Sequence, residues 1–247
     1  MKIIRTQTKV GDIFIPEKDV YIRKALLEHK IWEPNTLKLC LDRMTSESIV
    51  VEVGSHVGTH TIALAKHSRF VYAFEMQRLL FQILNVNCIF NGVTNVIPFL
   101  GGVSNENKKT YSVEVDWKEA PEINTGNIKI EKLTDVEQAS KSFFAMDIVK
   151  LDDHLKLLPY LTLLKIDVEG HEHKVLEGAK HLIKKFKPII ITECHGIKTD
   201  YTGERGNVEM IENILKECGT YDLKVFKETM KIEGKPLDNI NMLAVPK

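Results

Sequence analysis

The chain has 247 residues, of which 43% are hydrophobic, and its 34 basic residues balance its 34 acidic residues. This length and composition suit a single α/β domain with a full core, and the balanced charge gives no general bias toward nucleic acids or acidic membranes. Four scattered cysteines without a Cys-x-x-Cys pair argue against a zinc ribbon or a disulfide framework.

The first residues lack the apolar core of a signal peptide, and no apolar run approaches the roughly 18 residues of a membrane span. We therefore expect a cytoplasmic protein that neither enters a membrane nor binds nucleic acid.

Residues 1–45 are predicted to form a helical extension. Pro16 and Glu17 are typical of a helix start, with proline at the first position and an acid in the first turn. Residues 17–30 therefore read as helical, and a second helix follows Pro34. A homodimer, if one forms, is expected to use these helices.

From Ser48 onward, strand and helix patterns alternate. The segment SIVVEVG is a β-branched run ending in glycine, as in a strand that is buried on both faces of a parallel sheet. The alternation predicts an α/β fold, with a doubly wound, mostly parallel, Rossmann-like sheet of about seven strands. An antiparallel hairpin is expected to close the chain, and residues 173–186 are expected to form one helix. This domain is expected to span residues 46–247, with an insertion at about 104–142.

A glycine-containing turn follows the first of these strands. VEVGSHVGTHT places Gly54 and Gly58 between a strand and a helix, where the backbone can approach a ligand closely. VYAFE then places Glu75 at the end of the next strand, where an acid can accept both hydroxyls of a ribose. The pattern predicts an adenosine-containing cofactor. The expected cofactor-binding residues are Glu52, Gly54, Ser55, His56, Gly58, Glu75 and Met76.

The loop GSHVG lacks the Gly-x-Gly of the dinucleotide fingerprint. Ser55 or His56 would crowd a pyrophosphate, and Glu52 would repel it. An anion at Glu52 would instead attract the amino and sulfonium groups of S-adenosylmethionine, which is therefore the expected cofactor. An NAD-dependent oxidoreductase and a non-catalytic cofactor-binding domain are the alternatives from other classes.

The segment LLKIDVEGHE carries several charged residues at the end of a buried strand. In the doubly wound order this strand lies beside the glycine-loop strand, and ITECH ends the next one. Asp167, Glu193 and His195 are therefore expected to meet at one edge as the catalytic set, with Asp167 as general base or metal ligand. The same three residues would suit Mg²⁺ or Mn²⁺ if an ion takes part.

Other residues near this segment have expected roles as well. Glu169, His171 and Trp32 are predicted to contact the substrate. Gly170 is expected to adopt a backbone conformation that other residues resist. Lys165 points to the opposite face from its neighbours, where it is expected to pair with an acid.

Four segments, in this order, resemble the FkbM family of S-adenosylmethionine-dependent methyltransferases: VVEVGSHVGTHTIALA, VYAFE, LLKIDVEGHEHKVLEGAKHLI and PIIITE. The resemblance covers roughly residues 30–195, and KIDVEGHE is its most specific part. It implies a class I methyltransferase domain that O-methylates hydroxyls, often on sugars or natural products. The family's loop usually opens with Asp and contains Ala-Asn, whereas this chain has Glu52, Ser55 and His56.

We therefore expect a methyltransferase that acts on a hydroxyl of a sugar or glycan. A small natural product or another non-sugar acceptor is the nearest alternative. The 104–142 insertion and the amino-terminal helices are expected to select the acceptor.

Overall fold

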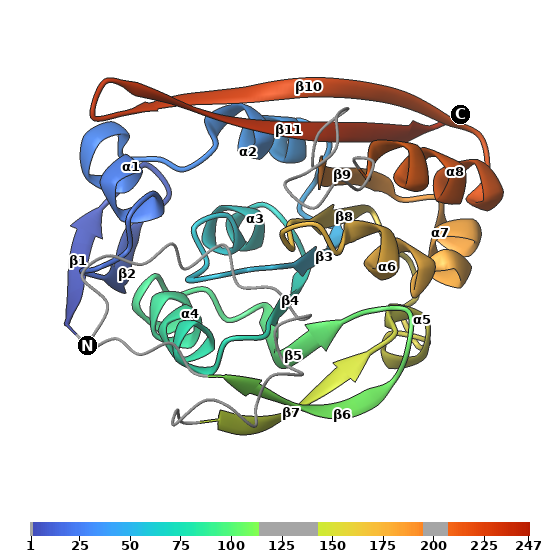
Figure 1. Cartoon of the computed structure of the whole chain (residues 1–247), viewed down its shortest axis with the longest axis horizontal. Coiled ribbons are helices and arrows are strands. Elements are labelled where there is room, and N and C mark those ends of the chain that lie inside the picture. Colours follow the sequence, from blue (N-terminus) through green and yellow to red (C-terminus); the bar gives the residue numbers. More distant parts are fainter. Residues whose placement is uncertain (1, 114–142, 195–206) are drawn as a thin grey trace.

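The computed structural model describes residues 2–113, 143–194 and 207–247. In these ranges a nine-stranded sheet has the order β10-β11-β9-β8-β3-β4-β5-β7-β6 (Figure 1). Its central strands run parallel. They are β9 (Ile189–Cys194), β8 (Leu163–Ile166), β3 (Ile49–Val53), β4 (Phe70–Glu75), β5 (Val96–Val103) and β7 (Phe143–Val149).

Antiparallel strands extend both edges of the sheet. At one edge, β11 (Lys235–Pro246) pairs with β9, and β10 (Tyr221–Ile232) pairs with β11. At the other edge, β6 (Lys108–Val113) pairs with β7. The predicted doubly wound sheet with an antiparallel carboxyl-terminal hairpin is therefore confirmed, although it has more strands than expected because β6 comes from the predicted insertion. Residues 114–142 of that insertion lie outside the described ranges.

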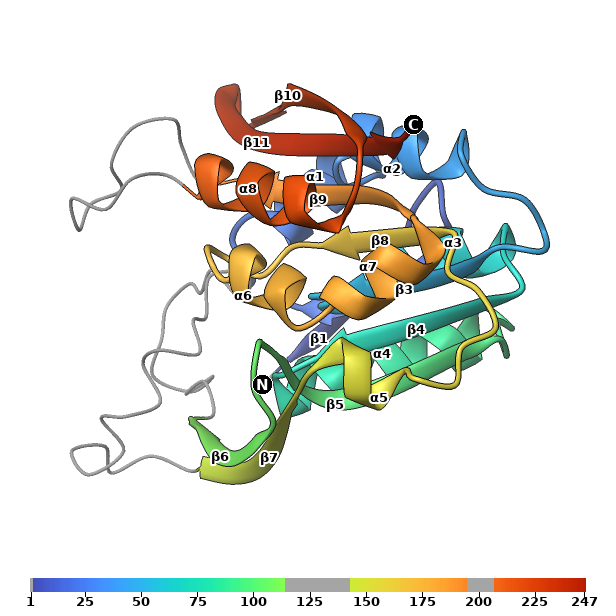
Figure 2. The same cartoon turned by 90° about the vertical axis from the view of Figure 1, so that its right-hand side faces the viewer.

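Helices cover both faces of the sheet, and every residue of β3 is buried between them. Val51 belongs to the apolar cluster on one face and Val50 to the cluster on the other. Figure 2 shows the first face, with α5 (Leu151–His154), α6 (Glu172–Glu177), α7 (Lys180–Phe186) and α8 (Val208–Cys218). The second face carries α1 (Ile22–His29), α2 (Pro34–Leu41), α3 (Thr61–Lys66) and α4 (Arg78–Phe90).

The amino-terminal segment is not only helical, because β1 (Ile3–Gln7) and β2 (Asp12–Pro16) form a hairpin that was not predicted. Pro16 ends β2, so the first helix begins at Ile22 and not at residue 17. The hairpin is tied to α4, since the Phe14 amide donates to Asn87 Oδ1 over 2.7 Å. These contacts join segments far apart in sequence, which local pattern does not reveal.

The helix predicted over residues 173–186 is also interrupted. A Cβ on Gly178 would lie 2.1 Å from the Ser104 carbonyl oxygen, so the chain packs closely there. The Asp152 carboxylate then accepts the amides of His181 and Leu182, each over 2.9 Å, and begins a separate helix.

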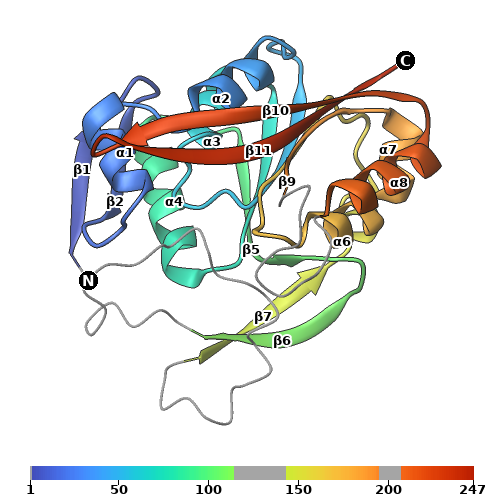
Figure 3. The same ribbon diagram turned by 45° about the horizontal axis from the view of Figure 1, so that its top comes forward.

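The long β10–β11 hairpin crosses beside α1 and α2 (Figure 3). Glu228 in β10 accepts hydrogen bonds from the Thr36 amide over 2.8 Å and from its hydroxyl over 3.1 Å. The amino-terminal helix α2 and the carboxyl-terminal hairpin are thus joined by hydrogen bonds. Within the described ranges, no helix is long and apolar enough to cross a membrane.

Candidate active site

The carboxyl ends of β3, β4, β8 and β9 lie along one edge of the sheet. The chain leaves β3 for β4 on one side and returns through β8 on the other. Such a switch point is where doubly wound sheets bind ligands.

The glycine loop begins directly after β3. Gly54 has φ 85°, and a Cβ there would lie 1.8 Å from the carbonyl oxygen of Asp167. Gly58 has φ 88°, and its Cβ would lie 2.6 Å from Leu84 Cδ1. The loop therefore packs between the end of β8 and α4 so closely that a side chain at Gly54 is excluded.

Glu75 ends β4 and bonds to the same loop. Its carboxylate accepts the His56 amide over 2.8 Å and the Gln77 amide over 2.7 Å. Burial raises the pKa of Glu75 to about 7, although these amides oppose the shift. Met76 follows it and is partly exposed. Two of the predicted cofactor-binding segments are thus joined by a hydrogen bond.

Glu52 lies beneath the loop, with its side chain only 1% exposed. Thr61 Oγ1 donates to Glu52 Oε2 over 2.5 Å, and Ser55 Oγ lies 3.4 Å from the Glu52 carbonyl oxygen. Burial raises the pKa of Glu52, and the nearby Lys165 ammonium opposes that effect. The side chain of Glu52 therefore braces the loop from inside.

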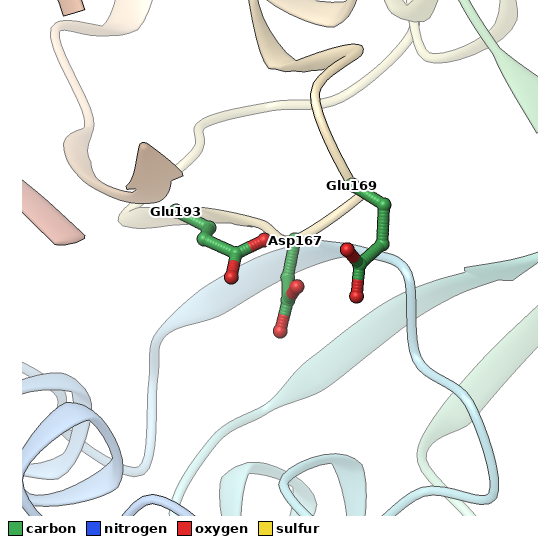
Figure 4. Close-up of side chains that lie close together, drawn as sticks. All are labelled: Asp167, Glu169 and Glu193. Atoms are coloured by element: carbon green, nitrogen blue, oxygen red, sulfur yellow. The ribbon is translucent and has the colours of Figure 1, made fainter. Parts of the chain in front are cut away.

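Three carboxylates gather at the ends of β8 and β9. Oxygen atoms of Asp167, Glu169 and Glu193 lie within 4.8 Å of one another. Figure 4 shows the three side chains turned toward a shared space from the β8 loop and from β9. The sequence predicted that Asp167 and Glu193 would meet, and the structure brings them together with Glu169. His195 lies outside the described residues.

The pKa values of Asp167 and Glu193 are shifted in opposite directions. Burial, the largest single influence, raises the pKa of Asp167, but the Lys165 ammonium acts with His60 and with hydrogen bonds from Lys165 and Glu193 to hold this pKa below its ordinary value. Burial, and then the charge of Asp167, raise the pKa of Glu193 well above its ordinary value. The two shifts have opposite directions, so ionisation is favoured at Asp167 and protonation is favoured at Glu193.

This charge distribution bears on the predicted metal. Carboxylate oxygens suit Mg²⁺ or Mn²⁺, and three of them are close enough to bind one ion. Two features lessen the need for an ion: the Lys165 ammonium pairs with Asp167, and the raised pKa of Glu193 favours its neutral form.

Glu172 braces the turn that carries Asp167 and Glu169. It is fully buried, and its Oε1 accepts the Val168 amide over 3.2 Å and the Gly170 amide over 3.0 Å. Burial raises its pKa to about 7. This role was not assigned from the sequence, although an acid in the first turn of a helix is a signal for such bonds.

The backbone of this turn is left-handed at two successive residues. Glu169 has φ 56° and Gly170 has φ 96°, as expected for the glycine. Asn207, at the start of α8, donates to Glu172 Oε2 over 2.5 Å and fixes the turn from the other side.

The predicted substrate residues are placed differently from one another. Glu169 belongs to the carboxylate cluster. His171 is buried, and its Nε2 lies 3.0 Å from Ser104 Oγ. Trp32 is half-buried against the apolar clusters, and its carbonyl oxygen accepts from His60 Nε2 over 3.0 Å. The contacts of His171 and Trp32 are thus with the protein itself.

Glu33 is a buried acid near the site that was not assigned a role from the sequence. It has φ 42°, and Asn239 Nδ2 donates to its Oε1 over 2.6 Å. Burial and then the charge of Asp167 raise its pKa to about 7. Its partner comes from β11, so only the folded hairpin reveals this arrangement.

A family model described as the methyltransferase FkbM domain matches residues 52–220. The hexuronic acid methyltransferase AglP of Haloferax volcanii is 26% identical over 163 residues, which cover 66% of this chain and 62% of that protein. This chain therefore spans less than two thirds of that relative.

Solved structures share the fold. Methyltransferase FkbM from Methylobacillus flagellatus KT superposes with a TM-score of 0.52 and 16% identity, covering 81% of this chain and 44% of that one. M. jannaschii TYW2, solved in complex with AdoMet, gives a TM-score of 0.54 and 14% identity, covering 98% and 85% of the two chains. With the family model matching most of its length, this chain belongs to the FkbM methyltransferase family.

Proposed function

We propose that this protein is an S-adenosylmethionine-dependent O-methyltransferase whose acceptor is a hydroxyl of a sugar or glycan. Membership of the family supports methyl transfer, and the name of the Haloferax relative supports a sugar-related acceptor. One observation carries the proposal. Gly54 packs against the carbonyl of Asp167, so the loop suited to a methyl donor adjoins the carboxylates suited to an acceptor.

The residues at the ends of β3 and β4 fit S-adenosylmethionine. Gly54 and Gly58 give the turn after β3 its left-handed backbone, and Glu75 stands where an acid accepts ribose hydroxyls. NAD would instead bring a diphosphate close to the buried Glu52. When bound, S-adenosylmethionine supplies a methyl group on a cationic sulfur that leaves as a neutral thioether.

Asp167 is the residue that we assign to the acceptor hydroxyl. Its carboxylate is ionised and partly exposed, so it can accept the hydroxyl's hydrogen bond and orient the oxygen. As the new C–O bond forms, the oxygen becomes a strong acid, so a carboxylate of low pKa suffices to take its proton. The hydroxyl proton would end on Asp167 when the methyl group is transferred.

A sugar suits the chemistry of this cluster. Asp167 and Glu169 can accept hydrogen bonds, and Glu193, whose raised pKa favours its protonated form, can also donate one. A polyhydroxylated ring presents several hydroxyl donors at spacings that such a cluster can bind. An apolar natural product would leave most of these groups without partners, which is costly at a buried site.

The test is a screen with labelled S-adenosylmethionine against sugar nucleotides, oligosaccharides and hydroxylated natural products. We expect label on a sugar hydroxyl, and we expect Asp167→Asn to lower turnover by about 10²–10⁴-fold. Calorimetry should show that this variant still binds S-adenosylhomocysteine. Transfer only to non-sugar acceptors would refute the substrate class, and tighter binding of NAD would refute the cofactor.

A further inference from the structure

Lys165 is a buried cation in the central strand β8. Its side chain is 4% exposed, and its strand neighbours Leu164 and Ile166 are apolar and buried. A lysine in such surroundings is strongly disfavoured unless acids compensate it. Its Nζ lies 3.4 Å from Asp167 Oδ2 and 3.9 Å from Glu52 Oε1.

The sheet geometry explains how one ammonium reaches both acids. Lys165 lies directly opposite Glu52 in the β3–β8 register. Asp167 is two residues further along, and side chains two apart in an extended chain lie on the same side. Lys165 therefore stands between the acid beneath the glycine loop and the acid at the acceptor cluster.

Other titratable groups also surround this pair. Acids facing Lys165, Asp167 or the neighbouring Glu193 come from five elements or turns: Glu33 before α2, Glu52 in β3, Glu169 in the turn after β8, Glu172 in α6, and Glu193 in β9. The remaining groups are Cys40 in α2, His56 in the glycine loop and His60 before α3.

These last three groups supply no positive charge near neutral pH. Burial raises the pKa of the Cys40 thiol to about 12 and lowers the pKa of His60 to about 3. Burial also lowers the pKa of His56. Among the groups named, Lys165 is thus the single cation that faces Asp167.

We propose that Lys165 is a positioning residue for methyl transfer, whose buried ammonium pairs with Asp167, orients it toward the acceptor and links it to Glu52 beneath the glycine loop. This inference rests on the proposed function, because it assigns Asp167 the acceptor hydroxyl. Loss of the Lys165 ammonium would change the ionisation of Asp167 in a measurable way. Without the ammonium, Asp167 would share its surroundings mainly with acids and would gain a proton at higher pH.

The first test is the pH profile of kcat/KM in Lys165→Met and Lys165→Arg. Removing the positive charge raises the pKa of Asp167, so the acid limb of Lys165→Met should move upward by about 1–3 pH units. Lys165→Arg keeps the charge and should restore most of the profile. Lys184→Met, at an exposed position of α7, serves as the control and should match the wild type.

A double variant separates this role from a role in folding alone. Lys165→Met leaves Glu52 buried without its cation, whereas Lys165→Met with Glu52→Gln removes that charge and keeps an oxygen for Thr61. The double variant should therefore fold, while its acid limb stays shifted. A double variant that folds with a wild-type profile would overturn the proposal.

A second measurement needs no acceptor. The carboxyl carbon of Asp167, assigned by comparison with Asp167→Asn, can be titrated by NMR in the wild type and in the double variant. A higher Asp167 pKa in the variant supports the role of Lys165 even if the protein methylates something other than a sugar hydroxyl. An unchanged pKa overturns it, whatever the acceptor.

Discussion

Gly54 and Asp167 are in contact through the backbone, since a Cβ on Gly54 would lie 1.8 Å from the Asp167 carbonyl oxygen. The two residues follow adjacent parallel strands, β3 and β8. The contact fixes the distance between the cofactor loop and the carboxylate cluster. A methyl donor and its acceptor must be aligned within a fraction of an ångström, so this packing is central to the site.

We expect Gly54→Ala to weaken binding of S-adenosylhomocysteine at least tenfold and to lower the melting temperature. The added Cβ meets backbone atoms, which cannot move aside as a side chain can. Gly92→Ala is the matched control, because Gly92 also has a positive φ, 66°, with no atom within 4 Å of the added Cβ. That control should cost only about 1–2 kcal/mol of backbone strain. If calorimetry shows that Gly54→Ala and Gly92→Ala weaken binding equally, the contact between Gly54 and Asp167 is not what shapes the cofactor site.

Glu75→Gln should raise the dissociation constant for S-adenosylhomocysteine about tenfold, because the ribose hydroxyls lose an ionised acceptor. With a pKa of about 7, Glu75 ionises as the pH rises through neutrality. Wild-type affinity should therefore increase between pH 6 and pH 8, while that of the variant should change little. Titration calorimetry across this range checks both, with the exposed Glu47→Ala as control. If the affinities of the wild type and of Glu75→Gln change with pH in parallel, Glu75 is not the group that binds the ribose.

Because the Glu172 carboxyl is buried, we expect the free energy of unfolding of the protein to depend on pH. Its folded pKa of about 7 exceeds the ordinary value of 4.5, so the folded state holds a proton that the unfolded state releases. The stabilisation is complete below pH 4.5 and is lost as the pH rises through 7, by about 3 kcal/mol at most. Glu172→Gln stays neutral and should flatten this part of the curve.

Urea denaturation of the wild type and of Glu172→Gln at pH 5 and pH 8 measures the difference. The free energy of unfolding of the wild type should fall more between these values than that of the variant. The opposite order would show that Glu172 is ionised in the folded protein.

Chelation tests the carboxylate cluster. Because the Lys165 ammonium pairs with Asp167 and the raised pKa of Glu193 favours its neutral form, we expect turnover to survive EDTA and to be unaffected by added Mg²⁺ or Mn²⁺. Loss of activity with EDTA and its recovery with one of these ions would instead identify the cluster as a metal site.

The sequence by itself predicted the alternating strands and helices, the glycine turn after β3 and the acid that ends β4. These features depend on residues close together in the chain, where hydrophobic periodicity and glycine placement are informative. The convergence of Asp167 and Glu193 followed from one further rule, the order of strands in a doubly wound sheet.

Only the tertiary structure decided how the charges are arranged. The β1–β2 hairpin, the bond between Glu33 and Asn239, and the burial of Lys165 between Glu52 and Asp167 join residues from separate elements. Whether a carboxyl is ionised depends on its burial and on the charges beside it, and both arise only when distant segments pack together.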